Sequence, residues 1–302
     1  MRPAPLILAV ALSLLASAVR TRGWFETLRA AYPDAKDLRH RDVLLAYFTG
    51  AGLNGLLPGR VGDAVKLAAL RRRRLPEAPY PTLAATLVPP GAVDGALGAG
   101  LVLWLLATGI VQFGELQRAS ALLQARLPLV LVCLGAIGVL AWLLRRQLPQ
   151  VVAQARAGVA ILARPRRLVG GILVWGVLAR LIRLAAVAAF IASFSLPLSF
   201  ATVALVAAVQ GMTPALGPAM TPVRALVLAY GFPRAAGEHI SLGRLAELLV
   251  GSHLALTIAT TTIMLAIVAV QLHSLSPRRV LGHLQQAAMA GRVALRGAVT
   301  QR

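Results

Sequence analysis

The sequence predicts an all-α, polytopic transmembrane helical bundle with two broken or re-entrant segments, and three observations predict it. Apolar residues make up 58% of the 302-residue chain and charged residues only 14%, whereas soluble domains are about 45–50% apolar and about 25% charged. Several apolar stretches approach the roughly 20 residues that cross a bilayer as a helix. The basic residues, which give a net charge of +21, lie between these stretches. This pattern is typical of cytoplasmic loops at an anionic leaflet, so we expect a membrane and no nucleic acid as partner.

The N-terminal part contains four predicted elements. Residues 3–19 form a first span, and residues 20–42 form a polar connector with six basic and four acidic residues. Residues 43–57 are apolar but short and rich in glycine, so they either cross at a tilt or re-enter. The connector is non-cytoplasmic in the first case and cytoplasmic in the second. After a Pro-Gly break, residues 60–74 predict an amphipathic helix that ends in four arginines.

The middle of the chain predicts three further spans. Residues 81–111 are interrupted by a Pro-Pro-Gly sequence, so they form either a kinked helix or two pieces. Residues 127–144 form another span. Residues 145–167 hold six arginines and no acid, which predicts a cytoplasmic loop. Residues 168–194 are apolar and long enough to cross.

The C-terminal part begins with an uncharged turn on the opposite side of the membrane. Residues 200–233 are broken repeatedly by glycine and proline, with helical pattern at 223–230, and predict a hairpin of half-helices that enters and leaves on one side. Residues 245–272 form the last span. The tail, 273–302, holds five arginines and no acid. The chain therefore divides into a membrane domain, 1–272, with about six full crossings, and a basic cytoplasmic tail.

Arg180 and Arg183 are the first candidate ligand-binding residues, because they lie near the middle of an apolar span. An arginine at this depth costs roughly 2.5–3.5 kcal/mol on insertion scales and is tolerated mainly where it faces protein or a wet cavity. Their i, i+3 spacing places both on one helix face. They predict either an anion site, such as one for a lipid phosphate, or a structural pair bonded to backbone carbonyls or to Asp94. Asp94 either neutralises one of these arginines or titrates during transport.

Residues 54–66 read Asn-Gly-Leu-Leu-Pro-Gly-Arg-Val-Gly-Asp-Ala-Val-Lys. This stretch resembles the motif N-x-x-L-P-G-R-x-G-[DE]-x-x-[RK] of the flippase-like membrane domain of lysylphosphatidylglycerol synthases and their stand-alone relatives. A basic run follows the motif, here Arg71–Arg74. The resemblance implies a multi-span bundle that moves, or helps to modify, anionic phospholipids or polyprenyl- or hopanoid-linked lipids. We expect a stand-alone member without the aminoacyl-transferase domain.

The second signature implied by the resemblance departs in this chain. Relatives carry roughly P-x-x-P-G-G-x-G-x-x-E on the late broken segment, where residues 214–224 read Pro-Ala-Leu-Gly-Pro-Ala-Met-Thr-Pro-Val-Arg. The proline and glycine break is kept, but the acid is absent and Arg224 ends the segment. This departure argues against proton or cation coupling. Arg224 is either a phosphate ligand or an interfacial anchor.

The first motif supplies further candidates for a lipid headgroup site. Arg60 offers a planar fork suited to phosphate, and Asp63 can pair with it or with Lys66. The alternative is an interfacial helix start, with Asp63 in the first turn and the arginine snorkelling to water. Asn54 would satisfy backbone carbonyls exposed by the break. The predicted substrate-binding residues are Asn54, Arg60, Asp63, Lys66, Asp94, Arg180, Arg183 and Arg224.

These features favour a transporter-like protein of the bacterial inner membrane, multi-pass with a cytoplasmic C-terminus, that translocates or presents a lipid with an anionic headgroup. Two alternatives stay open. One is a non-catalytic partner of a lipid-modifying enzyme, which the absent acid would fit. The other is a membrane transferase, for which only Asp63 and Asp94 are placed and no nucleotide-binding signature is present. We expect no cofactor and no metal, because the His and Glu residues of 238–253 have no spacing that unites three ligands.

Overall fold

The protein, seen in a computed structural model, consists of helices joined by turns and loops, with no β-strand in the residues that the structure describes. The described residues are 2–56, 61–112, 148–163, 168–211, 221–238 and 240–274. This confirms the predicted all-α class. Among the described residues, four helical stretches are long and apolar enough to cross a membrane: Pro3–Ala31, Tyr80–Ala107 (two consecutive helices), Val169–Ser193 and Leu242–Val270. The predicted span at 127–144 and the chain after residue 274 lie outside the described residues, so the six crossings and the domain division stay predictions.

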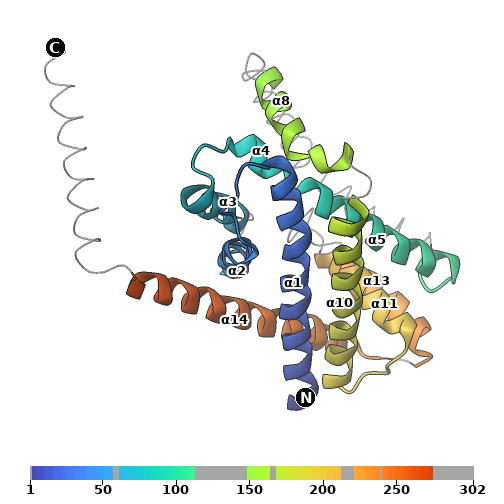
Figure 1. The fold of residues 1–302 in the computed structure, drawn as a ribbon. Helices are drawn as coiled ribbons and strands as arrows, with labels where there is room; N and C mark the ends of the chain where they lie inside the picture. The colour runs from blue at the N-terminus through green and yellow to red at the C-terminus, as the bar shows by residue number, and fades with distance from the viewer. Residues whose placement is uncertain are drawn as a thin grey trace, which may run out of the picture.

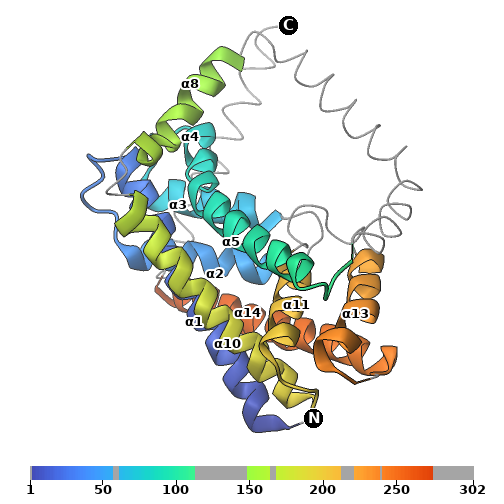
Figure 2. The same ribbon diagram turned by 90° about the vertical axis from the view of Figure 1, so that its right-hand side faces the viewer.

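Helices α1 (Pro3–Ala31) and α10 (Val174–Ser193) form the central antiparallel pair of the bundle (Figure 1). The amide of Arg2 donates a hydrogen bond of 2.8 Å to the carbonyl of Ser193, so the start of α1 lies against the end of α10. Both views of the ribbon show the two helices side by side along their length (Figures 1 and 2). This pair forms one wall of the candidate site.

Helix α1 is longer than the predicted span 3–19, because the polar second half of the helix is buried within the protein. Its last turns belong to the stretch predicted as a polar connector, 20–42. Thr21 and Thr27 have no exposed surface, and the Thr27 hydroxyl donates to the Gly23 carbonyl at 3.0 Å. A hydroxyl that donates a hydrogen bond to its own helix backbone can be buried. The prediction that the helix ends at residue 19, which was made from the polarity of the following residues, was therefore wrong.

Helices α2 (His40–Leu56) and α3 (Val61–Arg74) form a tight pair. A Cβ atom added to Gly62 would overlap the carbonyl oxygen of Gly50, so the two helices meet backbone to backbone. Gly52 lies close to the side chain of Met264 and to the Thr260 carbonyl oxygen. Glycine is the residue that allows such close approach between helices. The predicted amphipathic helix at 60–74 is confirmed as α3.

The predicted span 81–111 is two pieces, helices α4 (Tyr80–Ala85) and α5 (Val88–Ala107). The Pro-Pro pair occupies the first turn of α5, where no intrahelical hydrogen bond is lost through the missing N–H. The prolines therefore begin a helix rather than kink one. This confirms one of the two alternatives left open by the sequence.

The predicted cytoplasmic loop 145–167 contains helix α8 (Leu148–Gly158) and the 3-10 turn η1 (Ala160–Ala163). Helix α8 packs on α4, and the Thr82 hydroxyl donates to the Gln154 carbonyl at 2.9 Å. The sequence did not predict helix α8, because a run of basic residues without acids resembles a connecting loop.

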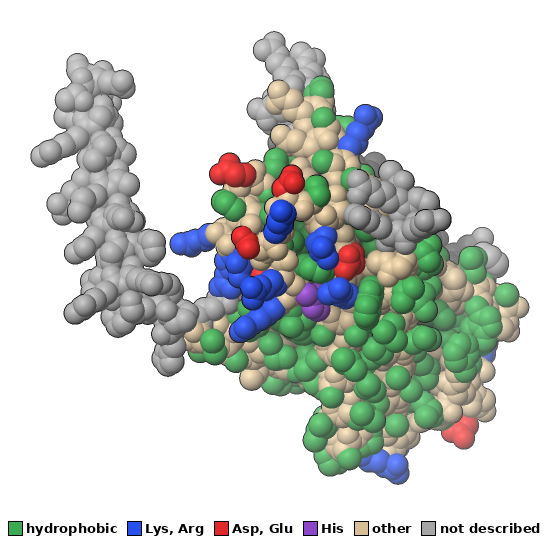
Figure 3. Space-filling view, in the orientation of Figure 1, with side chains coloured by type: hydrophobic (Ala, Val, Ile, Leu, Met, Phe, Trp, Pro, Cys, Tyr) green, Lys and Arg blue, Asp and Glu red, His purple; other side chains and the backbone are tan. Residues whose placement is uncertain are grey.

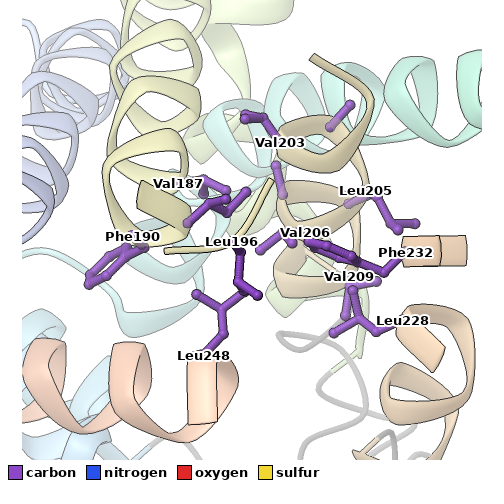
Figure 4. Packing of buried hydrophobic residues seen from close by; sticks show 14 of the residues in the cluster. Val187, Phe190, Leu196, Val203, Leu205, Val206, Val209, Leu228, Phe232 and Leu248 are labelled. Atoms are coloured by element: carbon purple, nitrogen blue, oxygen red, sulfur yellow. The ribbon is translucent and has the colours of Figure 1, made fainter. Parts of the chain in front are cut away.

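Helices α11 (Phe200–Gly211) and α13 (Thr221–Ala236) pack together and enclose the larger apolar core with α10 and α14 (Figure 4). Helix α13 continues past residue 230, where the predicted helical pattern ended, because Phe232 is fully buried in this core and holds the last turn in place. The loop between α11 and α13 lies outside the described residues, so the side on which this pair enters and leaves stays a prediction.

The spans predicted at 168–194 and 245–272 are both confirmed as helical. The first is the π-helical turn η2 (Val169–Leu173) followed by α10. The second is α14 (Leu242–Ser274), which packs mainly against α2. In Figure 1, α14 lies across the α1–α10 pair rather than along it.

Charged side chains are concentrated at one end of the molecule. Figure 3 shows Lys, Arg, Asp and Glu gathered in the region of α3 and α4, with a broad hydrophobic surface below them. Arg72, Arg73 and Arg74 are exposed at the end of α3. A hydrophobic band that meets a basic end is the surface expected of a protein embedded in a bilayer.

Candidate functional site

A cavity of about 890 Å³ lies between helices α1, α2, α3, α5, α10 and α11. Four basic side chains and two carboxylates contribute to its lining, so the net charge of the described lining residues is positive. The charged and larger polar lining residues are Arg20, Trp24, Tyr47, Asn54, Asp63, Lys66, Asp94, Arg180, Arg183 and Gln210. A cavity of this size and polarity within a largely apolar bundle is suited to a polar ligand.

The structure brings six of the eight predicted site residues to this cavity: Asn54, Asp63, Lys66, Asp94, Arg180 and Arg183. They come from four different helices, so sequence distance gave no indication of their proximity. Arg60 lies outside the described residues. Arg224 lies in α13, and the structure describes its backbone only.

Arg180 and Arg183 face the cavity from one side of α10, as their spacing predicts. The Nε and Nη2 atoms of Arg180 are buried and have no hydrogen-bond partner among the described residues. Gly98 of α5 lies opposite, where an added Cβ would be 3.9 Å from Nη2. Buried donors without acceptors are costly. The arrangement therefore offers two unused N–H groups to an acceptor that enters the cavity.

Asp94 forms an ion pair with Arg20 of α1, a partner that the sequence did not predict. The Asp94 carboxylate also interacts electrostatically with Arg180, one of its two predicted partners. Sequence reasoning missed Arg20 because the first span was ended at residue 19. A signal was present, since neither glycine nor proline interrupts the helical pattern before Gly23. Arg180 and Arg183 are the lining arginines that form no salt bridge with a carboxylate in the described part of the protein, so the local surplus of positive charge lies on α10.

Asn54 connects the end of α2 to the beginning of α3. Its Oδ1 accepts a hydrogen bond of 2.8 Å from the Gly62 amide, and its Nδ2 donates to Asp63 Oδ1 at 3.2 Å. The free groups at a helix start are N–H donors, and Asn54 satisfies one of them. The residues of the break, 57–60, lie outside the described residues, so the predicted role of satisfying their carbonyls stays a prediction. Asn54 thus acts from a neighbouring helix as a capping residue does.

Lys66 is paired with Asp63, which confirms one of the two predicted partners. Its Nζ donates to Asp63 Oδ1 at 2.9 Å. The same ammonium group lies 5.5 Å from the ring centre of Trp24 and 5.7 Å from that of Tyr47. Sequence reasoning missed both aromatic residues, because each lies in a different helix and no local pattern joins them to the motif.

His40 lies directly behind the cavity wall. Its Nε2 is 3.0 Å from the hydroxyl of Thr21, a lining residue, and its ring packs edge-on against Phe25. Burial lowers the pKa of His40 below its ordinary value, and the positive charge of Arg22 lowers it further, partly offset by Glu26. The neutral imidazole is therefore favoured in the folded protein.

The described residues bring together no group of three or more His, Cys, Asp or Glu side chains suited to a metal ion. Within the cavity, Asp63 and Asp94 are each bonded to a basic side chain. The arrangement offers cationic hydrogen-bond donors to an anion.

A comparison with protein families identifies the family to which the chain belongs. The profile described as the lysylphosphatidylglycerol synthase TM region matches residues 1–232. The chain belongs to this family. The family match includes every residue that lines the cavity and ends within α13. No curated protein and no solved structure matches the chain significantly.

Family membership and the apolar helices together define a multi-pass membrane protein related to lipid modification. The expectation of a lysylphosphatidylglycerol synthase-like membrane domain is thereby confirmed over most of the chain. The motif at 54–66 that carried the expectation contributes three residues to the cavity lining: Asn54, Asp63 and Lys66.

Proposed function

We propose that the protein translocates an anionic phospholipid or a polyprenyl- or hopanoid-linked lipid, or presents it to a lipid-modifying enzyme, with the headgroup held in the cavity. The observation that carries this proposal is the pair of buried nitrogen atoms of Arg180 that have no hydrogen-bond partner in the described part of the chain. A phosphate would supply the missing acceptors, and guanidinium binds phosphate through two parallel hydrogen bonds. Arg183 is one turn along the same face and adds a second positive charge.

Paired carboxylates favour transport or presentation over transferase chemistry. A general acid or base needs a carboxyl group that is available to the reacting atoms. Asp63 accepts hydrogen bonds from Lys66 and Asn54, and Asp94 is bonded to Arg20. The absence of an acid from the late sequence motif further favours movement without proton coupling. The free lipid gradient, or a partner enzyme that consumes the lipid, then sets the direction.

The distribution of arginines supports a bacterial inner-membrane protein whose basic end and C-terminus are cytoplasmic. Arg72, Arg73 and Arg74 are exposed at the charged end of the molecule. Positive residues near the ends of spans stay on the cytoplasmic side. In this orientation the motif at 54–66 approaches the cytoplasmic leaflet, where anionic lipids are drawn to basic side chains.

Reconstitution tests the proposal. The purified protein is placed in liposomes that contain phosphatidylglycerol with a fluorescent acyl chain, and dithionite then quenches the label in the outer leaflet. Wild-type protein should expose inner-leaflet lipid to quenching. Arg180→Gln should slow this at least about tenfold, since charged hydrogen bonds contribute roughly 1.5–3 kcal/mol.

Arg156→Gln is the matched control, because Arg156 is an exposed arginine of α8 outside the cavity. It removes the same charge and should leave the rate unchanged. Equal quenching by wild type, Arg180→Gln and protein-free liposomes would contradict translocation. If Arg180→Gln binds phosphatidylglycerol as well as wild type does, presentation of the lipid is contradicted as well.

A further inference from the structure

A second pocket, of about 660 Å³, lies between the end of helix α10 and the first turns of α14. Its lining includes Phe194, Ser195, Arg244, Glu247, Val250 and Gly251, and we call it the α10–α14 pocket. It shares no residue with the arginine-lined cavity described above. Figure 1 shows the end of α10 beside the N-terminus, at the opposite end of the α1–α10 pair from α4.

Arg244 and Glu247 give the α10–α14 pocket one positive and one negative charge. They lie three residues apart on α14, so both side chains project from the same face of the helix. Both residues are exposed, and neither forms a salt bridge or a side-chain hydrogen bond in the described part of the chain. Each charge is therefore available to a group of opposite sign. The two residues also lie beyond residue 232, where the family match ends.

An exposed apolar stripe on α14 continues from this charged pair. Leu254 and Ile258 follow Glu247 on the same helix face and are 56% and 59% exposed. At a rise of 1.5 Å per residue, the helix from Glu247 to Ile258 extends over about 16 Å. A pair of opposite charges followed by an apolar stripe matches a membrane lipid, in which a polar headgroup is joined to an acyl chain.

The turn after α10 holds Ser195 in a left-handed backbone conformation, with φ at 54°. The amide of Leu196 donates to the carbonyl of Ile191 at 3.2 Å, as in the helix ending that usually has glycine at the left-handed position. Serine is less favourable there than glycine. Backbone strain of this kind is concentrated at binding sites, and the Ser195 side chain provides a hydroxyl to the α10–α14 pocket.

The ring of Phe194 lies on the same side of the α10–α14 pocket as Glu247. A Cβ atom added to Gly251 would lie 2.6 Å from the Cζ atom of Phe194, so the ring packs directly on the backbone of α14. Glu247 lies one turn before Gly251 on this helix face. An aromatic ring and a carboxylate together attract an ammonium group. The guanidinium group of Arg244 is suited to a phosphate.

We propose that the α10–α14 pocket binds the headgroup of a zwitterionic phospholipid. The phosphate contacts Arg244 and Ser195, the ammonium group lies beside Glu247 and Phe194, and an acyl chain follows the apolar stripe of α14. A headgroup with both charges satisfies both side chains, whereas an anionic headgroup places a like charge beside Glu247. This binding does not depend on the function proposed above, because the two sites have no residue in common.

Photolabelling tests the proposal. The full chain in detergent micelles is mixed with phosphatidylethanolamine that carries a diazirine in one acyl chain, and the peptides labelled after illumination are identified by mass spectrometry. The label should concentrate on residues 250–258 of α14. Unlabelled phosphatidylethanolamine should compete about fivefold better than phosphatidylglycerol, which has no ammonium group. Labelling spread evenly over the exposed helices, or equal competition by the two lipids, overturns the proposal.

Two neutralising variants separate the two halves of the headgroup site. Arg244→Gln should reduce labelling of residues 250–258 about fivefold, because the phosphate loses its partner. Glu247→Gln should remove the preference for phosphatidylethanolamine and keep competition by phosphatidylglycerol. The matched controls are Arg156→Gln and Glu77→Gln, which remove exposed charges from α8 and from the turn between α3 and α4. Variants of Arg244 and Glu247 that behave like these controls overturn the proposal.

Ser195→Gly distinguishes a binding role of the serine from a structural one. Glycine adopts the left-handed conformation without strain, so the melting temperature of this variant should rise. Labelling of residues 250–258 should nevertheless fall, because the hydroxyl is lost from the α10–α14 pocket. A higher melting temperature with unchanged labelling would overturn the assignment of Ser195 to the headgroup site.

Discussion

Asp94 of α5 is ion-paired with Arg20 of α1, and this pair joins two helices across the cavity. Both side chains are partly exposed to the cavity, so the pair contributes to the field inside it as well as to the packing of the bundle. The acid is engaged by Arg20, and the Nε and Nη2 groups of Arg180 have no hydrogen-bond acceptor among the described residues. A structural ion pair thus makes the neighbouring arginine available to a ligand.

Removal of either member of this pair should destabilise the bundle, and removal of both should destabilise it less than the sum. We expect a coupling energy of roughly 1 kcal/mol for Arg20→Gln and Asp94→Asn in a double-mutant cycle. Thermal unfolding in detergent measures it. Strict additivity of the two single effects would show that the two side chains do not interact.

Gly62→Ala should destabilise the protein by roughly 1–3 kcal/mol, because the added methyl group would overlap the Gly50 carbonyl oxygen. Gly100→Ala is the matched control, since an added Cβ there meets nothing within 4 Å in the interior of α5. Alanine favours a helix over glycine by about 1 kcal/mol, so the control should be neutral or stabilising. Similar melting temperatures for the two variants would contradict the backbone contact.

Asn54→Ala should cost about 1 kcal/mol of stability, which is the usual contribution of a capping side chain. The variant loses the acceptor for the Gly62 amide and one donor to Asp63. Asn54→Asp keeps the acceptor but places a second carboxylate beside Asp63, so it should not restore stability. Unfolding midpoints compare the three proteins, and full rescue by aspartate would show that the bond to Asp63 is unimportant.

Stability should fall as the pH drops below about 6.5, the pKa of an unperturbed histidine. Burial and Arg22 lower the pKa of His40 in the folded protein, so the unfolded chain binds the proton first. The stabilisation is complete above the unfolded pKa and is lost as the pH falls through the folded one. His40→Gln should reduce the slope of melting temperature against pH in this range. An unchanged slope would show that other groups cause it.

The sequence was sufficient for those features that depend on local pattern or on the cost of a charge in the membrane. Arg180 and Arg183 were found because an arginine in an apolar span needs a polar environment, and α3 because its amphipathic pattern ends in a basic run. The pairing of Asp63 with Lys66 follows from their spacing on one helix. Each of these inferences needs only neighbouring residues.

Features that depend on packing between distant helices were not predictable in the same way. Arg20 and Trp24 lie in the second half of α1, where buried polar residues had the composition of a connector. Tyr47 reaches the site only because α2 is packed against α3 through glycine. Arg60, which matches the first family motif, and Arg224, which stands where the chain departs from the second, have no described side chain, so their predicted role as phosphate ligands is untested.

The contact between Gly50 and Gly62 also limits how the bundle can move. Helices that touch through their main chains have no side-chain layer in which to slide or rotate. Helices α2 and α3 should therefore move as a single rigid body that carries Asn54, Asp63 and Lys66 together. A bulky headgroup would have to be accommodated by displacement of other helices around this rigid body. A crosslink between α2 and α3 should therefore leave lipid movement unchanged. A crosslink between α5 and α10 should stop it.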